Sequence, residues 1–156
     1  MPRYWLLKSE PEAYSFEQLR ADKTTPWTGV RNFQARNNMM EMRLDDLAFF
    51  YHSSIAAPAA VGICKVVKTA YQDFTQLERA SEYFDGRAKN DKPIWFMVDV
   101  AYERALEHPV TLARMRAEPR LVGMALLRRG QRLSVQPVMP HEWKIVLELS
   151  RAPALA

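Results

Sequence analysis

Leu47-Ala48-Phe49-Phe50-Tyr51-His52-Ser53-Ser54 is the most informative stretch for the fold, because five consecutive apolar residues are followed at once by polar ones. An apolar run of this length, bounded by polar residues, is typical of a buried β-strand. It is far shorter than the roughly 18 residues that a membrane-spanning helix needs. The stretch therefore predicts a core strand of a soluble protein, with polar groups where the strand ends.

Further strands and short helices are expected on both sides of this strand. Apolar or alternating runs predict strands at residues 4–8, 60–67, 94–102 and 132–138. Capping residues and helical spacing predict helices from Ser15 to about residue 21, over residues 30–40 with Asn32 able to cap, from Thr111 to residue 117, and over residues 140–149. A polar connection covers residues 71–92. Because no repeat of parallel strand-helix-strand units occurs, we expect a single α+β domain over residues 1–156, built as a mixed β-barrel surrounded by short helices.

The composition fits a globular protein with a polyanionic partner. The chain has 156 residues and a formal net charge of +4, from 22 Lys and Arg against 18 Asp and Glu. Six arginines lie in the C-terminal half with only Glu118 among them, which predicts either a basic binding face or an ordinary solvated helix surface. These are Arg114, Arg116, Arg120, Arg128, Arg129 and Arg132. Cys64 is the only cysteine and is expected to be a buried thiol, and the N-terminus lacks a signal-peptide pattern, so we expect a cytoplasmic protein.

The sequence offers little for cofactor, metal or catalytic chemistry. His52, His108 and His141 are too far apart to indicate a metal site, and no glycine-rich phosphate loop indicates a nucleotide cofactor. Adjacent carboxylates at Asp45 and Asp46 would point to opposite faces of a strand, which favours turn capping over two-metal nuclease chemistry. We therefore assign no cofactor, no metal and no catalytic residue. An enzyme using Glu10 or His52 as general base is kept as the minority alternative.

Four polar and aromatic segments lie at expected strand ends or helix starts, at residues 8–11, 27–32, 51–53 and 132–137. Together they can form one pocket for a planar base, in which aromatic rings stack, polar groups contact the base edge and cations hold the flanking phosphates. Each residue also has a simpler explanation, such as core packing for Trp27 or helix capping for Asn32. The predicted base pocket comprises Ser9, Trp27, Val30, Asn32, Tyr51, Ser53, Ser134 and Gln136, and the predicted phosphate contacts are Lys8, Arg31 and Arg132.

The same segments resemble the EVE domain family, a PUA-like group. The resemblance covers nearly the whole chain and is carried by residues 4–11 (YWLLKSEP), 27–37 (WTGVRNFQARN), 46–53 (DLAFFYHS), 98–100 (VDV) and 132–138 (RLSVQPV). Leu44-Asp45-Asp46 departs from the family pattern, which usually has a glycine before the aspartate.

The resemblance implies a PUA-like β-barrel and a non-catalytic module that binds a modified base in single-stranded or flipped-out DNA or RNA. The short apolar runs predict no membrane partner and the spacing of the histidines predicts no metal partner, and the oligomeric state stays open. The alternatives are a module that binds a small nucleobase-like molecule or another protein, and, as a weaker case, an enzyme that modifies bases or RNA.

Overall fold

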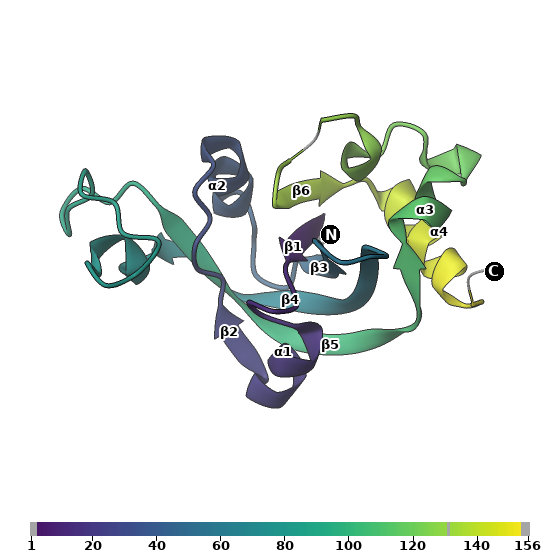
Figure 1. Cartoon of the computed structure of the whole chain (residues 1–156), viewed down its shortest axis with the longest axis horizontal. Helices are drawn as coiled ribbons and strands as arrows, with labels where there is room; N and C mark the ends of the chain where they lie inside the picture. The colour runs from purple at the N-terminus through teal and green to yellow at the C-terminus, as the bar shows by residue number, and fades with distance from the viewer. Residues whose placement is uncertain (1–2, 131, 154–156) are drawn as a thin grey trace.

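The computed structural model describes residues 3–130 and 132–153, which form a six-stranded mixed sheet in the order β2-β5-β4-β3-β1-β6 (Figure 1). Strands β1 and β3 pair in parallel at the centre, and the other neighbouring pairs are antiparallel. The strands are β1 (Tyr4–Ser9), β2 (Thr24–Pro26), β3 (Leu47–His52), β4 (Ala59–Gln72), β5 (Phe96–Thr111) and β6 (Val135–Val138). The helices are α1 (Phe16–Asp22), α2 (Phe33–Met40), α3 (Leu112–Arg116) and α4 (Pro140–Ser150), with short 3₁₀ turns η1 (Phe74–Leu77), η2 (Pro119–Leu121) and η3 (Ala125–Leu127).

The sheet is open and does not close into a barrel, so the predicted mixed β-barrel is wrong in that respect, whereas the predicted α+β class is confirmed. Strands β2 and β6 lie at opposite edges of the sheet, and both are short. Each contains a proline, Pro26 in β2 and Pro137 in β6. Because proline has no backbone N–H to donate to a neighbouring strand, it is tolerated at sheet edges and disfavours further pairing.

Side chains of the central strands alternate between two hydrophobic cores, one on each face of the sheet. In β3, Phe50 packs with Trp27 in one core, whereas Phe49 and Tyr51 pack with Trp143 in the other. Because successive side chains of a strand point to opposite faces, a continuous apolar run is what a strand covered on both faces requires. The expectation of a buried strand at residues 47–51 is confirmed.

Strands β4 and β5 form a long hairpin that curves across the molecule, with residues 73–95 projecting at one end and α3 and α4 lying at the other (Figure 1). Both strands are longer than predicted, because β4 continues beyond residue 67 and β5 beyond residue 102, where several exposed side chains interrupt the apolar pattern. Several register shifts between them mark β-bulges, which bend a strand and increase its twist. The predicted polar connection therefore contains the end of β4 and the turn η1.

The helix caps agree with the sequence prediction. Ser15 Oγ accepts a hydrogen bond from Gln18 N at 3.0 Å, and Asn32 Oδ1 accepts one from Ala35 N at 2.9 Å, so α2 begins at Phe33 rather than at residue 30. Thr111 likewise caps α3. Within the ranges 3–130 and 132–153, no helix has the length and apolar character needed to cross a membrane.

Two residues singled out by the sequence have structural roles. Asp46 is buried and accepts hydrogen bonds from Arg3 N at 3.0 Å, Trp5 Nε1 at 3.0 Å and Arg43 N at 2.9 Å, which confirms the capping interpretation. Cys64 is fully buried, as predicted, and this burial raises the pKa of its thiol to about 12.

Candidate functional site

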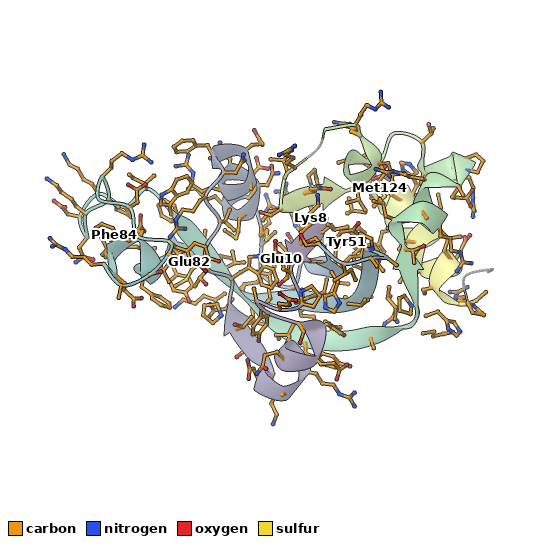
Figure 2. All side chains as sticks on the ribbon, viewed as in Figure 1. Lys8, Glu10, Tyr51, Glu82, Phe84 and Met124 are labelled. Carbon is orange, nitrogen blue, oxygen red and sulfur yellow. The ribbon has the colours of Figure 1, made fainter. Side chains whose placement is uncertain are left out.

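A cavity with a volume of about 760 Å³ opens beside the end of β1. It is bounded by residues 8–10 and 12–14, by the connection from β2 to α2 at residues 25–30, by residues 82 and 83 of the projecting segment, and by Ser134. Figure 2 labels Glu10 and Glu82, which line the cavity from the β1 end and from the projecting segment. A volume of this size is within the range of small-molecule sites.

Trp27 is the tryptophan of this cavity. Its backbone N donates a hydrogen bond to Val98 O at 2.7 Å, and its ring meets that of Phe50 edge-on with 5.4 Å between the ring centroids. The residue is only 7 % exposed, although it lines the cavity. Trp27 therefore belongs to the core as well as to the cavity wall.

Gly29 has a φ angle of +84°, a conformation that glycine adopts without the strain that a side chain would bring. A Cβ at this position would lie 2.6 Å from Cζ of Tyr83, so the absence of a side chain allows the tyrosine ring to approach the backbone. Gly29 N donates a hydrogen bond to Asp73 Oδ2 at 2.9 Å. The backbone of the cavity wall is thus joined to the projecting segment.

The ion pair between Arg31 and Asp73, with 3.1 Å between Nη1 and Oδ2, connects the same two segments. The Arg31 guanidinium donates five hydrogen bonds. Two go to Tyr83 O and one goes to Val30 O. The other two go to the side chains of Asp73 and Thr75. Because a guanidinium has five N–H donors, these bonds use all of them. Arg31 has no donor left for a phosphate unless it releases a protein partner, and its predicted phosphate contact does not fit this arrangement.

Carboxylates outnumber cations around the cavity. Glu10, Glu12 and Glu82 line it, with Lys8 as the lining cation. Burial lowers the pKa of the Lys8 ammonium. This excess of negative charge disfavours a phosphate inside the cavity and favours a neutral group that can donate hydrogen bonds.

Comparison with known proteins gives the family. A model of the EVE domain matches residues 3–149. The chain belongs to the EVE domain family. A protein named thymocyte nuclear protein 1 from Mus musculus is 40 % identical over 168 residues, which cover 96 % of this chain and 74 % of that protein.

Solved structures extend the similarity of this EVE domain to three dimensions. A hypothetical protein from Leishmania major has 43 % sequence identity and a TM-score of 0.92, covering 97 % of this chain and 96 % of the other. Human THYN1 protein in complex with DNA that contains 5-methylcytosine has 39 % identity and a TM-score of 0.90, covering 96 % and 98 % of the two chains. An ASCH protein from Zymomonas mobilis, at 9 % identity and a TM-score of 0.54, is similar in fold alone.

The EVE domain brings together only some of the predicted site residues. Those that line the cavity are Lys8, Ser9, Trp27, Val30 and Ser134. Tyr51 and Gln136 do not, and strand alternation explains why. Tyr51 packs with Leu6 and Phe49 in the core opposite to that of Trp27, and Gln136 pairs with Leu6 across the strands, so it shares that face.

The remaining predicted residues lie outside the cavity lining. Asn32 is exposed and caps α2, and Ser53 N donates to Ser9 O at 3.0 Å. Gln136, buried in β6, donates from Nε2 to Leu133 O at 2.7 Å, so its buried amide finds a partner as its environment demands. Arg132 is exposed, two residues before the lining residue Ser134. Their roles in binding stay predictions.

Sequence reasoning missed Tyr14, Tyr83, Glu12 and Glu82, and it considered Glu10 only as a general base in the enzyme alternative. Tyr83 and Glu82 come from the segment predicted only as a polar connection, about fifty residues after Trp27. No local periodicity marks such residues. The usable signal was Gly29, since a glycine in a left-handed turn often permits another group to approach the backbone closely.

The fold itself uses the ring nitrogen that His52 would need as a general base. His52 Nε2 accepts a hydrogen bond from Phe16 N at 3.1 Å. Burial lowers the pKa of His52. Over the described ranges, no three His, Cys, Asp or Glu side chains gather in a way that could hold a metal ion.

Two arginines of the arginine-rich part of the EVE domain are engaged within the fold, and the predicted basic binding face stays a prediction. Arg120 pairs with Glu118 at 2.6 Å and with Glu148 at 3.0 Å, and Arg114 donates to Ala152 O at 2.6 Å. These two arginines serve the surface of the fold itself. Arg116, Arg128, Arg129 and Arg132 are exposed.

Proposed function

We propose that this EVE domain is a non-catalytic reader that takes one modified base of DNA into the cavity beside Trp27. The observation that carries the proposal is the human THYN1 protein in complex with DNA containing 5-methylcytosine, because that protein shares 39 % of its sequence and nearly the whole fold with this chain. The cavity of about 760 Å³ supplies the matching physical site. A base enters it from a single strand or after flipping out of a duplex, at a cost of a few kcal/mol for unstacking.

The lining groups suit a base better than a phosphate. A carboxylate accepts a hydrogen bond from the exocyclic amino group of cytosine or adenine, and Glu10 and Glu82 provide such acceptors at the cavity wall. Ser9 and Ser134 add polar groups of the kind that contact base edges, and Val30 adds an apolar surface for a methyl group. Amino-bearing bases are therefore preferred over thymine and uracil.

The phosphates stay at the rim in this proposal. Arg132 is exposed near Ser134, and Lys8 lines the cavity, so these cations can hold the backbone that flanks the captured base. Binding then releases counterions, and the affinity falls as the salt concentration rises. The same module would accept the corresponding base in RNA, and we propose that it acts in the cytoplasm.

The test is binding of the purified protein to single-stranded DNA and RNA oligonucleotides that are unmodified or carry one methylated or hydroxymethylated base. Trp27→Phe is compared with Trp143→Phe, because both tryptophans are buried but Trp143 lies in the opposite core, 3.9 Å from Phe49 between ring centroids. Selective binding of one modification, weakened by Trp27→Phe and kept by Trp143→Phe, supports the reader.

Three results contradict the proposal. Equal affinity for modified and unmodified oligonucleotides would mean that the cavity does not read the base. Binding of free nucleobase without binding of any oligonucleotide would identify a small-molecule site instead. Turnover of the base, measured by mass spectrometry of the recovered oligonucleotide, would establish an enzyme.

A further inference from the structure

We infer that Tyr83 is a base-stacking wall of the cavity and that the Arg31–Asp73 ion pair positions it. The inference rests on the proposed function, since it names residues that would act on the same base. It assigns a binding role to the projecting segment at residues 73–95, which the sequence predicted as a polar connection up to residue 92.

Trp27 alone offers limited stacking surface. The residue is 7 % exposed, and its ring also contacts Phe50 in the core. A stacked base needs an accessible aromatic face. Tyr83 lines the cavity and is only half-buried, so its ring is the more accessible of the two.

The position of Tyr83 is determined by contacts at its backbone and at its ring. Arg31 donates to Tyr83 O from Nε at 3.1 Å and from Nη2 at 2.8 Å. The guanidinium carbon also lies 5.4 Å from the centroid of the Tyr83 ring. The ring itself packs against Gly29, where any side chain would collide with it. Lysine could not reproduce the two-nitrogen contact, because it carries one ammonium in place of the planar fork.

Asp73 joins both sides of the cavity through one carboxylate. Its Oδ2 accepts from Gly29 N at 2.9 Å and from Arg31 Nη1 at 3.1 Å, while its Oδ1 accepts from Thr75 N at 2.8 Å. The side chain is completely buried. These bonds hold the segment that carries Tyr83 at a fixed separation from the wall that contains Trp27 and Gly29. The separation preorganises a slot for a planar ring.

This arrangement makes Arg31 a positioning residue that acts through Tyr83. Replacing its guanidinium group should weaken base binding only when the Tyr83 ring is present. A residue that merely stabilised the fold would weaken binding by the same factor with or without the ring, because independent effects on free energy add.

The first experiment compares Tyr83→Leu with Phe84→Ala, using a single-stranded DNA oligonucleotide that carries one 5-methylcytosine. Leucine keeps an apolar side chain but has no ring for stacking, so we expect the affinity to fall by about 5- to 150-fold. Tyr83→Phe restores the ring and should recover most of the loss. Phe84 is the matched control, because it is the adjacent aromatic residue, is 42 % exposed and does not line the cavity.

The second experiment is a double-mutant cycle with Arg31→Lys and Tyr83→Leu, with folding of each variant verified by circular dichroism. We expect Arg31→Lys to weaken binding in the wild-type background and to cause no further loss beside Tyr83→Leu. If Arg31→Lys lowers the affinity by the same factor in both backgrounds, the positioning role of Arg31 is wrong. If Tyr83→Leu keeps the wild-type affinity while Trp27→Phe binds more weakly, the stacking role of Tyr83 is wrong but the proposed function stands. If the wild-type protein binds no oligonucleotide, the proposed function and this inference are both wrong.

Discussion

The ring of Phe16 in α1 lies directly against the backbone of Gly62 in β4. A Cβ on residue 62 would be 2.0 Å from Cζ of Phe16, far inside van der Waals contact. Phe16 also packs against Phe50 and Tyr102, with 5.2 Å and 5.1 Å between ring centroids, so the glycine allows α1 to close over one face of the sheet.

Gly62→Ala should therefore destabilise the protein by about 1–3 kcal/mol, because the added methyl group forces the aromatic cluster to move. The matched control is Gly123→Ala, since nothing lies within 4 Å of a Cβ at residue 123. Urea unfolding of the two variants measures the difference. Equal free energies of unfolding would show that the core accommodates the methyl group without strain.

Asp46→Asn should cost about 3 kcal/mol, because a buried carboxylate that accepts three N–H groups becomes an amide with only one good acceptor. Asp45→Asn is the neighbouring control. Asp45 is exposed with a φ angle of +71°, a conformation that asparagine also tolerates, so we expect a change below about 0.5 kcal/mol. Guanidinium unfolding checks both values, and a similar loss in the two variants would refute the role assigned to Asp46.

His52 should make the stability depend on pH in a narrow range. Burial lowers its pKa in the folded state below the ordinary value of 6.5, and Nε2 accepts a hydrogen bond from Phe16 N only when it is unprotonated. The unfolded chain then binds the proton first, so the stabilisation is complete above about pH 6.5 and is lost as the pH falls from there through the folded-state pKa.

The measurement is the free energy of unfolding against pH for the wild type and His52→Gln. Glutamine can accept the same hydrogen bond through Oε1 but does not titrate, so the variant should lose much of the pH dependence over this range. If the free energy of unfolding of the variant changes with pH as steeply as that of the wild type, other groups cause the pH dependence.

Arg132→Ala should reduce the salt dependence of oligonucleotide binding. If Arg132 contacts one phosphate, the slope of log affinity against log salt concentration decreases in magnitude by about 0.7–0.9. Arg120→Ala serves as the control, because Arg120 is paired with Glu118 and Glu148. Fluorescence anisotropy at several salt concentrations gives the slopes, and identical slopes for Arg132→Ala and the wild type would exclude the phosphate contact.

Much of the fold could be predicted because its signals are local. Ser15, Asn32 and Thr111 cap their helices as expected, and the apolar run at residues 47–51 is the buried strand β3. The predicted β-barrel does not close, because the pairing of sheet edges is not local. Pro26 and Pro137 are typical of edge strands, but the sequence does not show which strand each of them pairs with.

The residues of the candidate site were likewise predicted only where the signal is local. Residues close in sequence, such as Ser9 beside Lys8 and Val30 beside Gly29, were found by their position at the end of a strand and before a helix. Tyr51 was included because it ends a strand, yet its place in the alternation directs it to the core that contains Trp143. A shift of one residue in a strand changes the face, and the sequence does not say which face holds the cavity.

The sequence by itself determined the helix caps, the doubly covered central strand, the buried thiol and the EVE family motifs, because these depend on neighbouring residues and on the chemistry of single side chains. Only the tertiary structure decided that Arg31 is bound to Asp73 and Tyr83 and that Tyr83 lies against Gly29. Those contacts join residues 42 to 54 positions apart. They form because packing of the long β4–β5 hairpin brings its projecting segment back to the cavity, a result of the whole fold rather than of any local pattern.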